Sequence, residues 1–496
     1  MSIKETLLDL SIEEKEERMK AEVDYYFYKG KCEDREKAKY YKPYLGQNWE
    51  DGIERDYEPT QDIRNKVKPL LKKQARWMFS VKPDILINPI NSNDKEECEK
   101  LRQWIDKVLD DNKFWNKTKQ AFLMSTIKKR TMLRLAAGNG KINIRYEDLD
   151  NFSYKRIDDT LIEAKFFQED LNNAVRDEKV YYLHTFYYKK IDEEVSKATY
   201  RKETYKDSEL VEVKEQELGF EENKIPCWLI INGGDLGEEF GETDLHDLKV
   251  IQQEYNKRVS DVADAIKFGL FGVESVIDGN EDDVNQFKIV PGALHAMHTD
   301  PQAAANNKQA TIQRLEYSLS GISAVETYLE RAEKDMNYIL DMPSLKDLNN
   351  IPSAKAMRYL YNDLIARCEE KWNDWEPVLK ELISYIIAIA RESKLPGFDK
   401  KWEQLEYSMI IKHNYPIPSD EEEKKTLAMN EVINKVRSVK SYIKDFSNDE
   451  DVDGMYMEII KEQSELAGAD MAEFSTIDTT DEENEVDEEK EDEVDE

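Results

Sequence analysis

The chain has 496 residues, and its 72 lysines and arginines against 106 aspartates and glutamates give a net charge of −34. This charge argues against a protein that wraps nucleic acid with a basic surface, because such binding depends on neutralising phosphates. Residues 481–496 alone hold twelve acidic residues and one lysine, a composition that repels itself and predicts a disordered tail.

The cysteines and the first residues restrict the location of the protein. Cys32, Cys98, Cys227 and Cys368 are scattered singly, without a CxxC pair, which fits a reducing cytosol. The N-terminus is charged and lacks the apolar core of a signal peptide, and the most apolar run, 379–390, is too short to span a bilayer. We therefore expect a soluble protein with no membrane partner.

The first half of the chain predicts helices followed by antiparallel strands. After a polar arm over 1–60, apolar residues at helical spacing predict three helices, and Gly138-Asn139-Gly140 between two alternating runs predicts a β-hairpin. Further apolar and aromatic runs predict strands up to residue 231. The expected helices are 61–79, 95–110 and 115–129, and the expected strands are 132–137, 141–147, 161–167, 179–189, 198–205 and 225–231.

The second half predicts three long helices, each with one narrow apolar stripe: 243–270, with Thr243 as its cap, about 309–340, and about 354–392. Short strands are expected at 273–277 and 287–290, and Pro377 predicts a kink. The remaining elements are a strand or irregular segment at 401–411 and helices at 421–436 and 452–466.

Motifs for chemistry are weak. Gly138-Asn139-Gly140-Lys141 lacks the first glycine and the Ser or Thr of a phosphate-binding loop, and 278–283 lacks the glycine and terminal glutamate of a calcium loop. His295 and His298 supply only two ligands for a zinc ion. The aromatic residues of 181–188 could stack on bases, although a sheet core explains them better. We expect no enzyme activity, cofactor or metal.

The order of these elements resembles the portal proteins of tailed bacteriophages, most closely those of phages that infect Gram-positive hosts. The resemblance covers about 62–465, and two departures are Ala354 in place of a frequent glycine and Ser441 in place of a threonine. The segments that carry it are 65–83, 225–234, 241–245, 255–272, 352–360, 415–420, 436–440 and 453–465.

The resemblance implies an α+β portal-type fold with an α/β wing, a long-helix stem, a small α/β clip and a helical crown, assembled as a ring of twelve subunits around a DNA channel. It divides the chain into an N-terminal arm 1–60, wing 61–242, stem helix 243–270, clip 271–310, stem helix 311–340, tunnel loop 341–351, kinked wing helix 352–395, crown region 396–470 and acidic tail 471–496.

It also implies function and sites. The ring would sit at one capsid vertex of the virion, assemble in the host cytoplasm, and serve genome packaging, DNA retention, head–tail joining and DNA ejection. Its partners would be double-stranded DNA, the terminase, the head–tail adaptor, and the major capsid and scaffolding proteins. The implied DNA-channel residues are Ser344, Lys346, Asn349 and Asn350. The implied clip residues that bind terminase or adaptor are Val273, Glu274, Asp278, Phe287, Lys288, His295 and His298.

Two other classes stay open on sequence alone. One is an oligomeric phage structural or adaptor protein without a DNA channel, and the other is an enzyme on an α+β domain. A capsid scaffold would be helical and extended, without the β-rich region 130–231. Electron microscopy of the purified protein distinguishes these classes, and a ring with a central hole would support the portal class.

Overall fold

The computed structural model describes residues 3–30, 60–138, 140–157, 160–170, 179–190, 196–206, 208–219, 223–234, 237–271, 273–284, 297–315, 321–343, 354–393, 395–416, 421–446 and 451–476. These residues fall into two compact units. The first comprises 1–351 and 357–416, and the second comprises 352–356 and 417–496. No helix within the described ranges is both long and apolar enough to cross a bilayer.

The wing begins with two helices that the sequence reading had placed in an arm. Helices α1 (Ile3–Leu8) and α2 (Ile12–Lys29) pack on the wing: the Ser153 hydroxyl donates to Leu8 O, and Arg130 pairs with Glu14. Ser11 caps α2, since its side chain accepts from the Glu14 amide. Residues 3–30 of the segment predicted as an arm are therefore helical and contact the sheets.

Three further helices build the wing core. They are α4 (Val67–Phe79), α5 (Lys95–Asp111) and α6 (Phe114–Lys128). The last two match the predicted bounds within one residue, whereas α4 begins six residues later than predicted. Phe79 packs against Phe122 of α6 and Trp375 of the long helix α12 (Asn362–Ser393), with ring centroids 5.6 and 5.3 Å apart. Aromatic burial thus joins α4 to α6 and α12.

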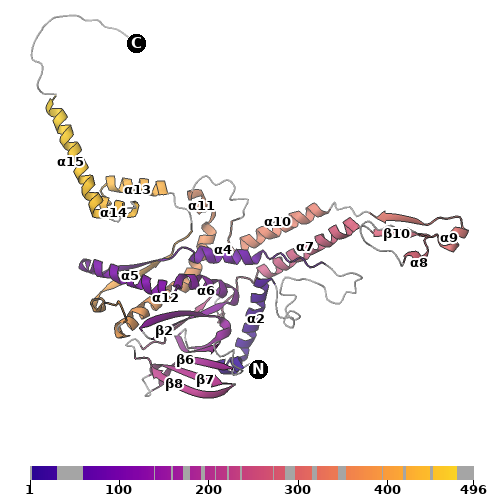
Figure 1. The fold of residues 1–496 in the computed structure, drawn as a ribbon, viewed down its shortest axis with the longest axis horizontal. Helices are drawn as coiled ribbons and strands as arrows, with labels where there is room; N and C mark the ends of the chain where they lie inside the picture. Colours follow the sequence, from indigo (N-terminus) through magenta and orange to yellow (C-terminus); the bar gives the residue numbers. More distant parts are fainter. Residues whose placement is uncertain are drawn as a thin grey trace, which may run out of the picture. The chain divides into compact units, whose positions relative to one another are not determined.

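Two antiparallel sheets complete the wing (Figure 1). The smaller has the order β3-β2-β9 and confirms the predicted hairpin; its turn residue Asn139 lies outside the described residues. The larger has the order β4-β5-β6-β7-β8. Their strands are β2 (Arg130–Gly138), β3 (Lys141–Glu147), β4 (Phe152–Ile157), β5 (Thr160–Glu169), β6 (Val180–Lys190), β7 (Ser196–Lys206), β8 (Glu209–Glu217) and β9 (Cys227–Ile231).

The stem consists of α7 (Leu248–Phe271) and α10 (Ile322–Ile339), which lie side by side in Figure 1. Between them come β10 (Val273–Ile277), short helices α8 (Glu281–Val284) and α9 (Pro301–Ala305), and β11 (Thr311–Leu315). The helices predicted from the sequence differ in two places here. Residues 311–315 form a strand that pairs with β10, and residues 243–247 precede α7, with turns at 244–247.

A second two-stranded sheet pairs distant parts of the chain. Strand β1 (Asp84–Pro89), which the sequence analysis did not predict, pairs with β12 (Tyr407–Lys412), so the 401–411 segment is a 3₁₀ helix (Lys400–Gln404) followed by a strand. Helix α11 (Ala354–Leu360) precedes α12, which continues through Pro377. Two more 3₁₀ turns lie at Ser92–Asp94 and Leu149–Asn151.

The second unit is helical. It contains α13 (Glu421–Ile433), α14 (Val439–Phe446) and α15 (Val452–Thr476). Helix α14 was not predicted, and α15 extends ten residues beyond its predicted end. Lys440 joins α14 to α15 through an ion pair with Asp453, with Nζ 2.6 Å from Oδ1, although both side chains are at least half exposed, so that the pair contributes little to stability.

Candidate functional site

An extended segment, residues 60–66, lies along the first stem helix, α7, and is hydrogen-bonded to it. We call this segment the strap. Backbone amides of alternate strap residues donate to polar side chains one helical turn apart on α7. The four pairs are Thr60 to Asp264 (3.1 Å), Asp62 to Ser260 (3.0 Å), Arg64 to Asn256 (3.1 Å) and Lys66 to Gln252 (2.9 Å). The same side chains return bonds, since Gln252 donates to Arg64 O and Ser260 donates to Asp62 O.

The regularity of this ladder follows from backbone dimensions. Two residues of extended chain advance about 6.6 Å, and four residues of α-helix advance about 6 Å, so each rung stays within hydrogen-bond distance of the next pair. The α7 side chains of the ladder are at most 8% exposed. Because buried polar groups are costly without partners, the strap and α7 require each other.

A second set of polar side chains lies at the foot of the stem, just before α7. Asp244 accepts hydrogen bonds from Gln74 of α4 (2.8 Å), Asn232 (3.1 Å) and Lys371 of α12 (2.8 Å). A terminal nitrogen of Arg367 of α12 lies 3.4 Å from Asp244 Oδ2, the oxygen that also accepts from Gln74. We call Gln74, Asn232, Asp244, Arg367 and Lys371 the stem-base cluster.

The charges of this cluster are compensated. Burial by itself would raise the pKa of the Asp244 carboxyl, whose side chain is 6% exposed, but Lys371 and Arg367 outweigh it and hold the pKa below its ordinary value. Asp244 is therefore ionised at neutral pH. The predicted helix 243–270, with Thr243 as its cap, does not begin at this point; α7 begins at Leu248, and the Thr243 hydroxyl donates to Thr126 O.

Arg367 also reaches the end of the second stem helix. One of its terminal nitrogens lies 3.4 Å from Ile339 O, in the last turn of α10, and 3.4 Å from an Asp341 carboxylate oxygen. The start of α7 and the end of α10 are thus tied to one arginine of α12. The segment predicted as the tunnel loop, 341–351, begins at this point.

The predicted DNA-channel residues cannot be placed. Ser344, Lys346, Asn349 and Asn350 lie outside the described residues, as do Phe287, Lys288 and His295 of the predicted clip. Residues 341–343 are described and are not helical, which agrees with an interruption there.

The remaining clip residues gather on and beside the β10–β11 ribbon. Val273 and Glu274 lie on β10, opposite Leu315 and Arg314. Asp278 follows β10, and its backbone oxygen accepts from the Asp300 amide. His298 is exposed, and its backbone amide and ring Nδ1 lie 2.7 and 3.0 Å from Asp283, which lowers the pKa of Asp283.

The acidic turn 278–283 therefore uses one of its carboxylates to hold His298. Within the described ranges there is no group of three or more histidine, cysteine, aspartate or glutamate side chains placed to hold a metal ion. The structure brings the end of β10 next to the residues before α9. This region offers exposed backbone and side chains to a binding partner.

The chain matches the family model described as "Phage portal protein, SPP1 Gp6-like" over residues 9–471. This match spans nearly the whole chain and places the molecule among the phage portal proteins. The chain belongs to the SPP1 Gp6-like family of these proteins. The family resemblance and the portal-type α+β fold expected from the sequence are confirmed.

Solved structures of gene transfer agent particles are also similar. A chain from "Neck of empty GTA particle computed with C6 symmetry" shares 9% identity over 76% of this chain and 91% of that chain, with a TM-score of 0.39. A chain from "Neck of native GTA particle computed with C12 symmetry" shares 9% over 79% and 95%, with a TM-score of 0.37. At these values the likeness adds nothing to the family assignment. No curated protein matches the chain significantly.

Proposed function

We propose that this portal protein assembles into a closed ring, of twelve copies, at one capsid vertex, and that double-stranded DNA passes through its centre. The observation that carries the proposal is the family match over residues 9–471. The ring would be built in the host cytoplasm with capsid and scaffolding proteins and would remain in the virion.

The stem supports assembly with further copies. Within the described part of α10, only Ala332 and Met336 are buried, while Tyr338 is 81% exposed. On the other stem helix, Ile266 is 40% exposed. A helix with as little covered surface as α10 needs neighbours, and heterologous contacts that close into a ring supply them.

The β10–β11 ribbon supports the docking role of the clip. A two-stranded ribbon is marginally stable by itself, and Ile277 and Ile312, which lie on its two strands, are 44% and 38% exposed. Terminase during packaging and the head–tail adaptor afterwards would bind this clip. Replacing residues 273–315 with a flexible linker is expected to abolish capture of both partners in pull-downs while the wing remains folded.

The loop after Asp341 would touch DNA weakly. In the sequence, its lysine, Lys346, is followed closely by Asn349 and Asn350, and the chain as a whole is strongly negative. Contacts between Lys346 and DNA phosphates would therefore remain reversible. Lys346→Glu is expected to reduce packaged DNA or its retention, with Lys107→Glu on exposed α5 surface as the matched control. Normal DNA length and titre in Lys346→Glu particles would remove the loop from the DNA path.

Electron microscopy of the purified protein tests the ring itself. A ring with a central hole is the expected image, and a stable monomer at micromolar concentration in moderate salt would contradict the proposal. The motor that hydrolyses nucleotide would be the separate terminase, so the purified ring is expected to show no ATPase activity.

A further inference from the structure

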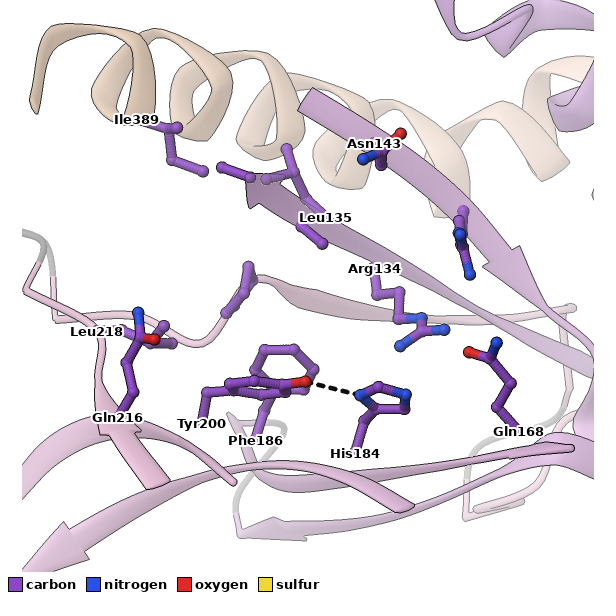
Figure 2. Close-up of a pocket in the computed structure, with 14 residues that line it drawn as sticks. Arg134, Leu135, Asn143, Gln168, His184, Phe186, Tyr200, Gln216, Leu218 and Ile389 are labelled. Atoms are coloured by element: carbon purple, nitrogen blue, oxygen red, sulfur yellow. Dashed lines mark hydrogen bonds between the residues drawn. The ribbon is translucent and has the colours of Figure 1, made fainter. Parts of the chain in front are cut away.

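A cavity of about 460 Å³ lies between the two sheets of the wing (Figure 2). Strands β2 and β3 line one side, and β5, β6, β7 and β8 line the other, with Ile389 of α12 at the margin. None of its lining residues belongs to the stem, the strap or the clip. We call this cavity the wing pocket.

The two ends of the wing pocket differ chemically. Figure 2 shows apolar side chains, among them Leu135, Leu218 and Ile389, towards one end, with the amide of Gln216 beside Leu218. Arg134, His184 and Gln168 lie together towards the other end, and Arg145 and Asn143 also line the pocket. A ligand that fills it would therefore need both an apolar part and a polar, hydrogen-bonding part.

The polar end carries more positive than negative charge. The register of β2 and β3 sets Arg134 directly opposite Arg145, an arrangement that is unfavourable for like charges. Glu147 satisfies Arg134, with Oε1 2.7 Å from Nε. Arg145 is exposed and has no hydrogen-bond or ion-pair partner among the described residues. The Glu147 carboxylate thus pairs with Arg134 alone, and the charge of Arg145 is left without a partner among the described residues.

His184 adds an unused polar atom. Its Nδ1 lies 2.7 Å from the Tyr200 hydroxyl, while its Nε2 is buried and has no partner among the described residues. Burial lowers the pKa of His184, and the nearby charges of Arg134, Lys202 and Arg145 lower it further, to about 3. The ring is therefore neutral at neutral pH, and if Nδ1 accepts from Tyr200, Nε2 carries the proton and is free to donate.

We propose that the wing pocket binds a carboxylate next to a large apolar side chain in an extended acidic peptide segment. The carboxylate would take the two free groups, the Arg145 guanidinium and His184 Nε2, while the apolar side chain would occupy the end formed by Leu135, Leu218 and Ile389. An extended segment fits because Gln216, at the pocket, lies on β8, which in the described sheet pairs on one side only.

The test uses the full-length assembled protein and two short fluorescein-labelled peptides. One has a glutamate flanked by leucines, and the other has glutamine in its place. Fluorescence anisotropy is expected to show binding of the glutamate peptide at least about tenfold tighter, the usual effect of a charge-assisted hydrogen bond. Equal binding of the two peptides would overturn the proposal.

Substitutions at the exposed arginine localise the binding. Arg145→Gln is expected to remove most of the preference for glutamate, and Arg145→Lys to restore part of it. Arg76→Gln, which removes an exposed arginine from α4, is the matched control for net charge and is expected to bind as the unaltered chain does. Arg145→Gln with undiminished preference for glutamate would overturn the site.

The acidic peptide has two possible sources, another protein or residues 481–496 of this chain. The same titration with a chain that ends at Thr480 distinguishes them. Tighter binding after the deletion identifies the tail as a competitor for the pocket, and unchanged binding assigns the pocket to an external segment. Both outcomes require the preference for glutamate described above.

Discussion

The Lys371 ammonium lies 2.8 Å from the Asp244 carboxylate. This ion pair joins the long wing helix α12 to the turn that precedes the first stem helix, α7. The Asp244 side chain is 6% exposed and that of Lys371 is 12% exposed, so water screens the pair little. Arg367, one helical turn before Lys371, shares the same carboxylate and reaches Asp341. The geometry of both stem ends therefore depends on one buried aspartate.

Asp244→Asn is expected to destabilise the protein by about 3 kcal/mol, because removing the carboxylate leaves Lys371 buried without its counter-charge and Arg367 with Asp341 as its remaining acidic partner. Urea unfolding followed by tryptophan fluorescence measures the change. Asp247→Asn, an exposed aspartate three residues later, is the control and is expected to change stability by less than about 0.5 kcal/mol. Equal effects of the two substitutions would contradict the structural role of Asp244.

The same residue predicts a dependence on acid. The folded-state pKa of Asp244 lies below its ordinary value, so the unfolded chain takes up a proton first as the pH falls. The stabilisation is present above about pH 4 and is lost as the pH falls through the lower folded-state pKa. Below pH 4, Asp244→Asn should therefore lose less stability on further acidification than the unaltered chain.

Asn256→Ala is expected to weaken the strap. The Arg64 amide and the Gln252 side chain would each lose an acceptor in a buried place, at a cost of about 1–3 kcal/mol for each unsatisfied group. Limited proteolysis should cut the variant faster within 60–66. Lys267→Ala, on exposed α7 surface, is the control, and strap cleavage at the same rate in both variants would show that the ladder does not hold the strap.

His184 predicts a separate loss of stability in weak acid. Its pKa is lowered from 6.5 to about 3, so between these values the unfolded chain binds a proton that the folded chain does not. Stability conferred by the neutral ring is present above about pH 6.5 and falls as the pH drops towards 3. His184→Gln should flatten the fall in unfolding free energy between pH 7.5 and 5. Exposed His246→Gln should not, and an unchanged profile in His184→Gln would contradict this assignment.

Gly241→Ala is expected to destabilise the loop between β9 and α7. Gly241 has φ +73°, and an added Cβ would come 2.5 Å from Cγ2 of Ile231. The left-handed backbone and the clash together should cost about 2 kcal/mol. Gly219→Ala, where φ is not positive and no atom lies within 4 Å, serves as the control in thermal unfolding. A tolerated Gly241→Ala would mean that the loop relaxes.

The sequence predicted the elements whose apolar residues recur with a clear period. It did not predict elements whose residues are exposed, because these show no such period. Helices α5 and α6 were predicted because their apolar residues recur at helical spacing, and the β2–β3 hairpin was predicted because two β-like runs flank a Gly-Asn-Gly turn. Strand β8 was missed because all nine of its residues are exposed, so its sequence shows no buried face. Residues of β11 were assigned to a helix because Leu315 happens to continue the spacing of α10.

The candidate site was less predictable than the fold, because its polar contacts join distant segments. Gln252, Asn256, Ser260 and Asp264 form a visible polar stripe at four-residue spacing on α7. Their partners are backbone amides of 60–66, to which the Thr60 hydroxyl adds a bond to Asp264, and backbone amides leave no mark in the sequence. The role of Asp244 depends in the same way on Arg367 and Lys371, more than a hundred residues later, and only tertiary structure brings the three together.

The four rungs between the strap and α7 have a mechanical consequence. Amides face the helix only at alternate strap residues, and acceptors return only once per helical turn. Sliding α7 along the strap by less than one rung, about 6 Å, would set every amide between two acceptors and break the four bonds together. The helix and the strap therefore move as one rod, or separate completely. A displacement of the first stem helix along its axis would therefore carry the strap with it, and with the strap the start of α4, which follows directly after Lys66.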